Sequence, residues 1–406
     1  MATSRLALLL AALAMLGPFA IDTYLPAFPS MEASLGASTI EVQQTLTVYM
    51  VAFAAMTLWH GAFADVFGRR NVILAWLAVF AVASLGCAAA NSVQYLWAFR
   101  VLQGISAGAG VVVGRAMIRD LHSGPQAERL LSLVTMIFSI APALAPVLGG
   151  WIVRLADWRS IFLFIFGYSA LLLWVCWKHL PETLPVARRQ ALDARALARS
   201  YVRVFRSPVF QLNAGTIAFV FSGLFLYVAA APVFLIRHLG LGTHQFGWQF
   251  VPTVAGIFLG ALTANRLAGR LSVPRQVRLG LAVLVLAALA NVAYHVMMPP
   301  TPSWSIAPLF FYAFGMAVTM PGVTLLVLDL FAEIRGIVAS SQSFTMTMLG
   351  ALAAGVAAPA LSGSVLALAL GQLACAVAAL VCWRLGRWQT RVLAADARRN
   401  AWETVP

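Results

Sequence analysis

Charged residues are scarce in this sequence: only 10% of its 406 residues are Asp, Glu, Lys or Arg, against about 25% in an average soluble domain. Lysine is nearly missing, with Lys178 as the single example. Because the Walker A loop needs a lysine beside a glycine-rich turn, ATP is not the expected energy source. The zinc-protease motif H-E-x-x-H is missing too. We therefore expect no enzyme.

Cysteine is also rare, and its placement argues against disulfides and zinc sites. All four cysteines lie inside apolar segments, and no two of them have metal-ligand spacing such as C-x₂-C. We expect inert thiols, no metal and no cofactor. The net charge of +14 does not indicate nucleic-acid binding, because the arginines form short clusters between apolar runs.

Long apolar runs are what the sequence does have, since 62% of its residues are hydrophobic. Each run is long enough for the roughly 20 residues of a membrane-spanning helix. The first could also be a signal peptide, but apolar character continues past Asp22, which favours an uncleaved helix. The twelve predicted segments are 5–29, 39–63, 71–90, 94–118, 127–153, 158–178, 208–236, 244–265, 276–297, 304–328, 335–360 and 363–386. This predicts an all-α membrane protein.

The basic residues predict the orientation and the division of the chain. Loops rich in arginine alternate with loops that hold few, which puts both termini in the cytoplasm. Six arginines follow Pro181 in an amphipathic linker expected to lie on anionic lipid. We expect a six-helix bundle over 1–180, the linker over 181–207, a second bundle over 208–390 and a cytoplasmic tail over 391–406. Matching Gly-Arg pairs, at 68–69 and 269–270, favour two pseudo-symmetric bundles, as in transporters built from repeats.

Asp22 is the least expected residue of the first apolar segment. A carboxylate in the middle of a membrane costs roughly 2.5–3.5 kcal/mol on insertion scales. Pro26, four residues later, has no N–H for the Asp22 carbonyl. Since lipid satisfies neither group, we expect Asp22 to face protein or a water-filled cavity.

Arg100 is a second buried charge, in the fourth segment. Counting about 1.5 Å per residue along each helix places Arg100 and Asp22 at similar depths. We expect an ion pair or a shared hydrogen-bond network between them. The alternative is that Arg100 extends to the outer membrane surface.

The loop after the second segment carries the pattern G-x-x-x-D-x-x-G-R-R, from Gly61 to Arg70. It resembles the most specific signature of the major facilitator superfamily. The resemblance implies two six-helix bundles and a conformational latch between them, formed by this loop. An acid at the end of the fourth helix either joins this latch or only ends the helix in solvent. The latch residues are Gly61, Asp65, Gly68, Arg69, Arg70 and Asp120.

Two further motifs sharpen the resemblance. Pro142, Pro146, Gly149 and Gly150 in the fifth segment resemble the superfamily's antiporter motif, with Ala145 in place of a glycine. The stretch around Asp22 is similar to the first helix of drug–proton antiporters, above all the Bcr/CflA drug-resistance branch. This implies that Asp22 couples drug to protons, and R-x-x-Q-G at Arg100 resembles a proton-coupling motif of the fourth helix.

A drug-binding cavity should be lined by aromatic and a few polar side chains. We expect its lining to be Asp22, Tyr24, Tyr49, Gln103, Phe138, Phe225 and Tyr227. Four histidines, at 60, 238, 244 and 295, are expected near the membrane boundaries.

These observations predict a monomeric drug exporter of the bacterial inner membrane. It exchanges protons for small amphipathic compounds, such as chloramphenicol- or bicyclomycin-like antibiotics, by alternating access of one cavity. The proton gradient is its energy source, and its partners are the drug, protons and the lipid bilayer, without nucleic acid. The alternative is an exporter or symporter of an endogenous metabolite.

Overall fold

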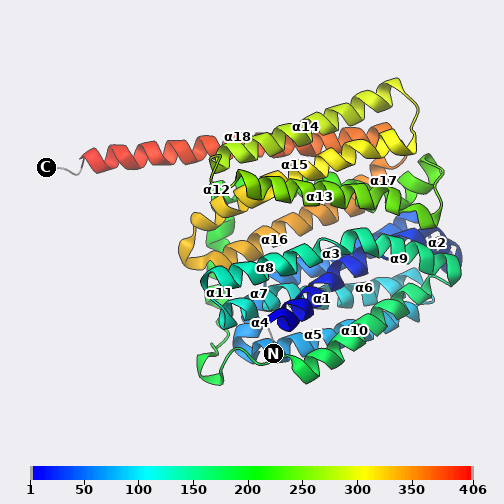
Figure 1. The fold of residues 1–406 in the computed structure, drawn as a ribbon, viewed down its shortest axis with the longest axis horizontal. Helices are drawn as coiled ribbons and strands as arrows, with labels where there is room; N and C mark the ends of the chain where they lie inside the picture. Colours follow the sequence, from blue (N-terminus) through cyan, green and yellow to red (C-terminus); the bar gives the residue numbers. More distant parts are fainter. Residues whose placement is uncertain (1–2, 404–406) are drawn as a thin grey trace.

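The computed structural model describes residues 3–403, and of residues 3–5, 125, 128, 132, 332 and 391–403 it describes the backbone alone. Over this range the chain is helical apart from turns and one isolated bridge (Figure 1). Eleven helices are long and apolar enough to cross a membrane, and a bent pair provides a twelfth. The predicted all-α membrane fold is confirmed.

Two groups of long helices lie side by side, one from each half of the chain (Figure 1). The first half contains α1 (Thr3–Asp22), η1 (Leu25–Ala27), α2 (Phe28–Leu35), α3 (Thr39–Thr57), α4 (His60–Phe67), α5 (Arg69–Ala88), α6 (Val93–Ala107), α7 (Ala109–Leu121), α8 (Gly124–Phe138), α9 (Ala141–Leu155) and α10 (Arg159–His179). Between the halves lie η2 (Val186–Arg188) and α11 (Ala194–Phe205). The second half contains α12 (Pro208–Ala229), η3 (Pro232–His238), η4 (Thr243–Gln245), α13 (Gly247–Leu267), α14 (Val273–Met297), α15 (Pro302–Asp329), η5 (Ala332–Ile334), α16 (Arg335–Leu352), η6 (Ala353–Ala357), α17 (Ala358–Leu361) and α18 (Val365–Glu403).

Several predicted spans are broken rather than straight. The first is interrupted after Asp22, and Pro26 lies in the 3₁₀ turn that follows, as its missing N–H leads one to expect. The second predicted span, over 39–63, is bent, because α3 and α4 meet at an angle of 50°. No proline marks this bend; α4 continues to Phe67, where Gly68, with φ of 92°, makes the turn into α5.

Large apolar side chains cover the outside of the helix groups, as expected where lipid is the solvent. Leu155, Val82 and Leu286, from three different helices, are all more than half exposed. An aqueous surface rarely carries so many, whereas a bilayer accommodates them. The protein is therefore a multi-pass membrane protein.

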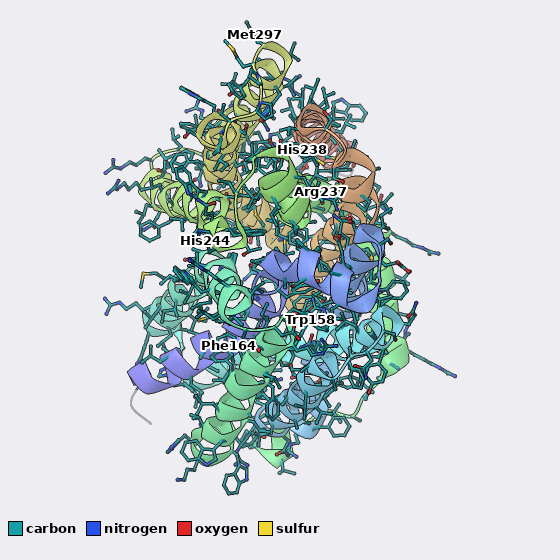
Figure 2. All side chains as sticks on the ribbon, turned by 90° about the vertical axis from the view of Figure 1, so that its right-hand side faces the viewer. Trp158, Phe164, Arg237, His238, His244 and Met297 are labelled. Carbon is teal, nitrogen blue, oxygen red and sulfur yellow. The ribbon has the colours of Figure 1, made fainter. Side chains whose placement is uncertain are left out.

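The two ends of the bundle differ. We call the end that carries the α4–α5 turn and α11 the linker end, and the opposite one the distal end (Figure 1). At the distal end the halves are joined: Gln44 Nε2 donates to the Gly355 carbonyl at 2.8 Å, and Arg237 donates to Thr39 Oγ1 at 3.0 Å and pairs with Glu32 at 3.6 Å. Figure 2 looks onto this end, with Arg237 and His244 at the boundary between the halves.

The linker end holds a cavity of about 550 Å³ between the halves. Its walls come from α4 and α7 on one side and from α11 and α16 on the other. Tyr201 of α11 donates its hydroxyl hydrogen to the Leu58 carbonyl at 2.6 Å, so the linker helix is tied to the first half. This conformation is closed at the distal end and hollow at the linker end.

Candidate functional site

Arg100 on α6 is the most completely buried charge of the molecule, with no exposed surface. Its Nη1 donates to the Ala20 carbonyl of α1 at 2.9 Å, and its Nε donates to the Thr45 carbonyl of α3 at 3.3 Å. Its guanidinium lies over the rings of Tyr24 and Tyr49, 4.4 Å from each centroid. Such cation–π contacts contribute about 2 kcal/mol when desolvated. Arg100 therefore ties α1, α3 and α6 together, and the alternative that it extends to the membrane surface is wrong.

Gln103 extends this network to a fourth helix. Arg100 Nη1 donates to Gln103 Oε1 at 2.8 Å, and Gln103 Nε2 donates to Ser84 Oγ of α5 at 2.8 Å. Cys87 contributes a weaker sulfur contact to Gln103 Oε1 at 3.6 Å. Arg100 Nη2 is buried and has no partner among the described residues. The Nη2 group of the fixed Arg100 cation is therefore a donor that no described residue uses.

Asp22 lies at the C-terminal end of α1, where the helix breaks, and is only 5% exposed. The expected ion pair with Arg100 is not formed in this conformation, and the Asp22 carboxylate makes no hydrogen bond within residues 3–403. Arg100 instead binds the backbone two residues earlier, at Ala20. The structure brings the two residues to neighbouring positions and leaves the acid without an ionic partner.

Two glycines of α9 explain the motif of the fifth span. A Cβ on Gly149 would overlap the carbonyl oxygen of Thr23, the residue after Asp22, and one on Gly150 would overlap the Thr243 carbonyl of the second half. Pro142 starts α9 just after the break from α8, and Pro146 lies within it. Gly149 therefore packs against the break after Asp22, and the next residue, Gly150, packs against the second half of the chain.

The residues expected to line the drug cavity lie in different surroundings. Phe138 borders a pocket of about 100 Å³ between α1, α7 and α8. Tyr24, Tyr49, Gln103 and Tyr227 have no exposed surface in this conformation.

In the second half, Phe225 is also buried, and it stacks on Phe221 with ring centroids 5.2 Å apart. Tyr227 belongs to a separate polar group there, in which Asn291 Nδ2 donates to its hydroxyl at 2.9 Å. The sequence showed no reason why these aromatic groups should pack into helix contacts rather than face a cavity.

The residues expected to form the latch between the halves lie together at the linker end. Arg69 pairs with Asp65 at 2.6 Å and with Asp120 at 3.2 Å, although it is nearly buried. Gly61 of α4 faces Val112 of α7, with room for a Cβ at 3.9 Å, and Arg70 Nη2 donates to the Trp177 carbonyl at 2.6 Å. All these contacts stay within the first half.

Residues of the linker complete the latch and were missed by the sequence analysis. Glu182 Oε1 accepts from the backbone N–H of Arg69 at 2.9 Å, and Thr183 donates to Asp120 at 2.8 Å. Arg189 pairs with Glu182 at 3.7 Å. The available signal was the scarcity of acids: with 13 Asp and Glu against 27 Lys and Arg, each acid next to a basic loop is a candidate partner.

His60, one of the four histidines expected near the membrane boundaries, is buried inside the first half. It has no exposed surface, and its ring lies edge-on to Trp76 at a centroid distance of 5.6 Å. It occupies the bend between α3 and α4, opposite Gly108, where a Cβ would approach the imidazole to 3.1 Å.

The sequence Gly104-Ile-Ser106-Ala-Gly108 in α6 has the G-x-S-x-G spacing of serine hydrolases. In those enzymes the serine stands on a sharp strand-to-helix turn. Here Ser106 lies within a helix and donates to the carbonyls of Leu102 and Gln103, at 2.8 and 3.0 Å. This is the usual bonding of a helical serine and carries no hydrolase chemistry.

Comparison with known proteins agrees with this arrangement. Residues 9–355 match the family model described as Major Facilitator Superfamily. A bicyclomycin resistance protein homolog of Haemophilus influenzae is 31% identical over 297 residues, which are 71% of this chain and 75% of the relative. The multidrug transporter MdfA of Yersinia pestis is 27% identical over 328 residues, 81% and 80% of the two chains.

Solved structures are similar in fold. The xylose transporter XylE from E. coli, in a partially occluded inward open conformation, superposes with a TM-score of 0.72 at 12% identity over 94% of this chain and 97% of that one. A bacterial homolog of the lysosomal transporter Spinster, in an inward-facing conformation, gives a TM-score of 0.70 at 16% identity, over 97% and 98% of the two chains.

Proposed function

The chain belongs to the major facilitator superfamily, and we propose that it exports small amphipathic drugs across the bacterial inner membrane in exchange for protons. It is a transporter and not an enzyme. Chloramphenicol- and bicyclomycin-like antibiotics are the first candidate substrates, since relatives at 31% and 27% identity are named for bicyclomycin resistance and multidrug transport. The proton gradient is the energy source, without a cofactor.

The observation that supports this proposal best is the isolated carboxyl group of Asp22. It is nearly buried, has no ion pair with any residue that the structure describes, and follows the backbone segment that Arg100 holds through Ala20. A proton that binds or leaves Asp22 changes the charge of this break by one unit, in a setting where a charge costs roughly 2.5–3.5 kcal/mol. Such a change is large enough to alter the balance between two conformations.

The contacts of α9 suggest how this change reaches the other half. Gly149 touches Thr23, which follows Asp22, and Gly150 touches Thr243 in the second half. A shift of the break after Asp22 therefore moves α9 at Gly149, next to the Gly150 contact with the second half. Export follows if the proton and the drug favour different conformations.

The arginine-rich loops indicate which way the molecule is oriented in the membrane, and this orientation gives the cavity at the linker end its role. We assign the linker end to the cytoplasm, together with both termini, because the arginine-rich loops lie there. In this assignment the structure is ready to receive a drug from the cytoplasm. The closed distal end, with the Glu32–Arg237 pair, then separates the cavity from the outside.

Export and proton coupling are tested together with Asp22→Asn. The amide keeps the size of the carboxyl group but does not exchange a proton at physiological pH. We expect at least a tenfold loss of drug transport driven by a pH gradient in membrane vesicles, with normal amounts of folded protein. A susceptibility panel of chloramphenicol-like and bicyclomycin-like compounds and dyes, in cells with wild-type protein, identifies the substrate.

Asp157→Asn is the matched control. Asp157 is an exposed acid that pairs with Arg159 at 3.1 Å at the distal end, and its loss should leave transport within twofold of the wild type. Undiminished gradient-driven transport by Asp22→Asn would remove Asp22 from the mechanism. Wild-type protein that protects cells against none of the compounds would refute drug export.

A further inference from the structure

A groove on the outside of the second half lies away from the proposed transport path. It runs between the linker-end parts of α14 and α18, two helices that pack against each other, and its volume is about 640 Å³ (Figure 1). None of its lining residues belongs to the Asp22–Arg100 site or to the cavity between the halves. The residues used below are Arg278, Leu286, Trp383, Arg384, Arg387 and Trp388.

Three arginines make this groove strongly positive. Arg278 comes from α14, whereas Arg384 and Arg387 lie three residues apart on one face of α18. None of the three forms an ion pair or donates a hydrogen bond to another described residue, and no acidic residue lines the groove. Three like charges that converge without a protein partner favour an anion between them.

The part of the groove farther from the linker end is apolar and faces the region of lipid. Leu286, two turns of α14 beyond Arg278, is 65% exposed. Trp388 directly follows Arg387 on α18, at the arginines' end of the groove, and is 63% exposed. Trp383 forms a buried wall, and the Arg387 guanidinium lies 5.9 Å from the centroid of its ring. Tryptophan and arginine at one level are typical of the membrane interface, where headgroups lie.

We propose that this groove binds an anionic phospholipid. The phosphate is held by Arg278, Arg384 and Arg387, since guanidinium groups bind phosphate oxygens in pairs of hydrogen bonds. An acyl chain then follows α14 past Leu286. Basic pockets between membrane helices have this chemistry, and a phosphate without an acyl chain would leave the apolar part of the groove unused.

The usual distribution of positive charge does not account for the groove. Arginines that only orient a membrane protein gather around the turns between helices, as Arg266 at the end of α13, Arg270 in the turn and Arg275 at the start of α14 do. All three are exposed at the same end of the molecule, and none of them lines the groove. They therefore provide a matched control for number and sign of charge.

The test compares two triple variants of the full-length protein in neutral detergent. One is Arg278→Gln/Arg384→Gln/Arg387→Gln, and the other is the control Arg266→Gln/Arg270→Gln/Arg275→Gln. Binding of phosphatidylglycerol and of phosphatidylcholine is measured by native mass spectrometry. We expect at least a tenfold loss of phosphatidylglycerol affinity in the groove variant, and less than twofold in the control, with little phosphatidylcholine bound by any form. Equal losses in both variants, or none in the groove variant, would overturn the proposal.

Two additions keep the result clear if the groove variant folds poorly. Inorganic phosphate is added as a competitor. If it displaces the lipid at an equal concentration, the groove binds simple anions and the phospholipid proposal is wrong. In otherwise wild-type protein, phosphatidylglycerol with brominated chains should quench indole fluorescence, and Trp388→Phe should remove part of that quenching. Equal quenching by brominated phosphatidylcholine would contradict the assignment.

Discussion

The first half buries one acid and one arginine close together without pairing them. Arg100 is bound by two backbone carbonyls, two aromatic rings and Gln103, so its position is fixed on every side except at Nη2. Asp22 has no comparable partner. The proposed proton coupling uses this arrangement, in which a fixed cation lies next to an acid without an ionic partner among the described residues.

Arg100→Lys tests whether the shape of the cation matters as well as its charge. An ammonium group cannot bind the Ala20 and Thr45 carbonyls and lie flat over both rings at once, and each buried partner left unpaired costs about 1–3 kcal/mol. We expect at least a tenfold loss of gradient-driven drug transport with protein that is still folded, measured in vesicles. Arg159→Lys is the control, because Arg159 also lies over a tryptophan ring, at 4.4 Å, but at the distal end. Transport at wild-type rates with lysine at position 100 would mean that charge alone suffices.

The sequence was sufficient to find the charged residues of the site but not their partners. Asp22 and Arg100 are conspicuous because charges are so scarce in apolar segments. Ser84, in contrast, looks like many other helical hydroxyl residues, and only packing places it beside Gln103. The partners of Arg100 at Ala20 and Thr45 are backbone carbonyls, which every residue has, so the residue types do not reveal them. The missing ion pair could not be predicted either, since equal depth does not fix the direction of a side chain.

Helices of this protein are interrupted where the halves meet. The break after Asp22 and the π-helical η6 both lie on contacts between helices, and Pro26 and Pro359 next to them are visible in the sequence. The bend between α3 and α4 has no proline, so nothing in the residues over 39–63 indicated it. Prolines therefore predicted part of the bending, and contacts distant in sequence determined the rest.

Gly149→Ala tests the contact of α9 with the break after Asp22. The added Cβ would overlap the Thr23 carbonyl, so either α9 or the break must move. We expect a tenfold or larger loss of drug transport and a lower unfolding temperature. Gly167→Ala, in the interior of α10, is the control: no atom lies within 4 Å of its Cβ, and alanine favours a helix by up to about 1 kcal/mol. Equal effects of the two substitutions would show that the close approach is unimportant.

The whole molecule is held in one conformation by contacts at its distal end. Glu32 and Arg237 pair at 3.6 Å across the halves, and a partly exposed pair of this kind contributes about 0.2–1 kcal/mol. Glu32→Arg replaces the attraction by repulsion, and we expect severalfold faster amide hydrogen exchange in η4 and η6, measured by mass spectrometry. The double variant Glu32→Arg/Arg237→Glu restores opposite charges and should return exchange to within twofold of the wild type. Asp157→Arg, which breaks a pair within the first half alone, should leave η4 and η6 unchanged. If it accelerates their exchange as much as Glu32→Arg does, or if the double variant fails to restore it, the pair does not hold the halves together.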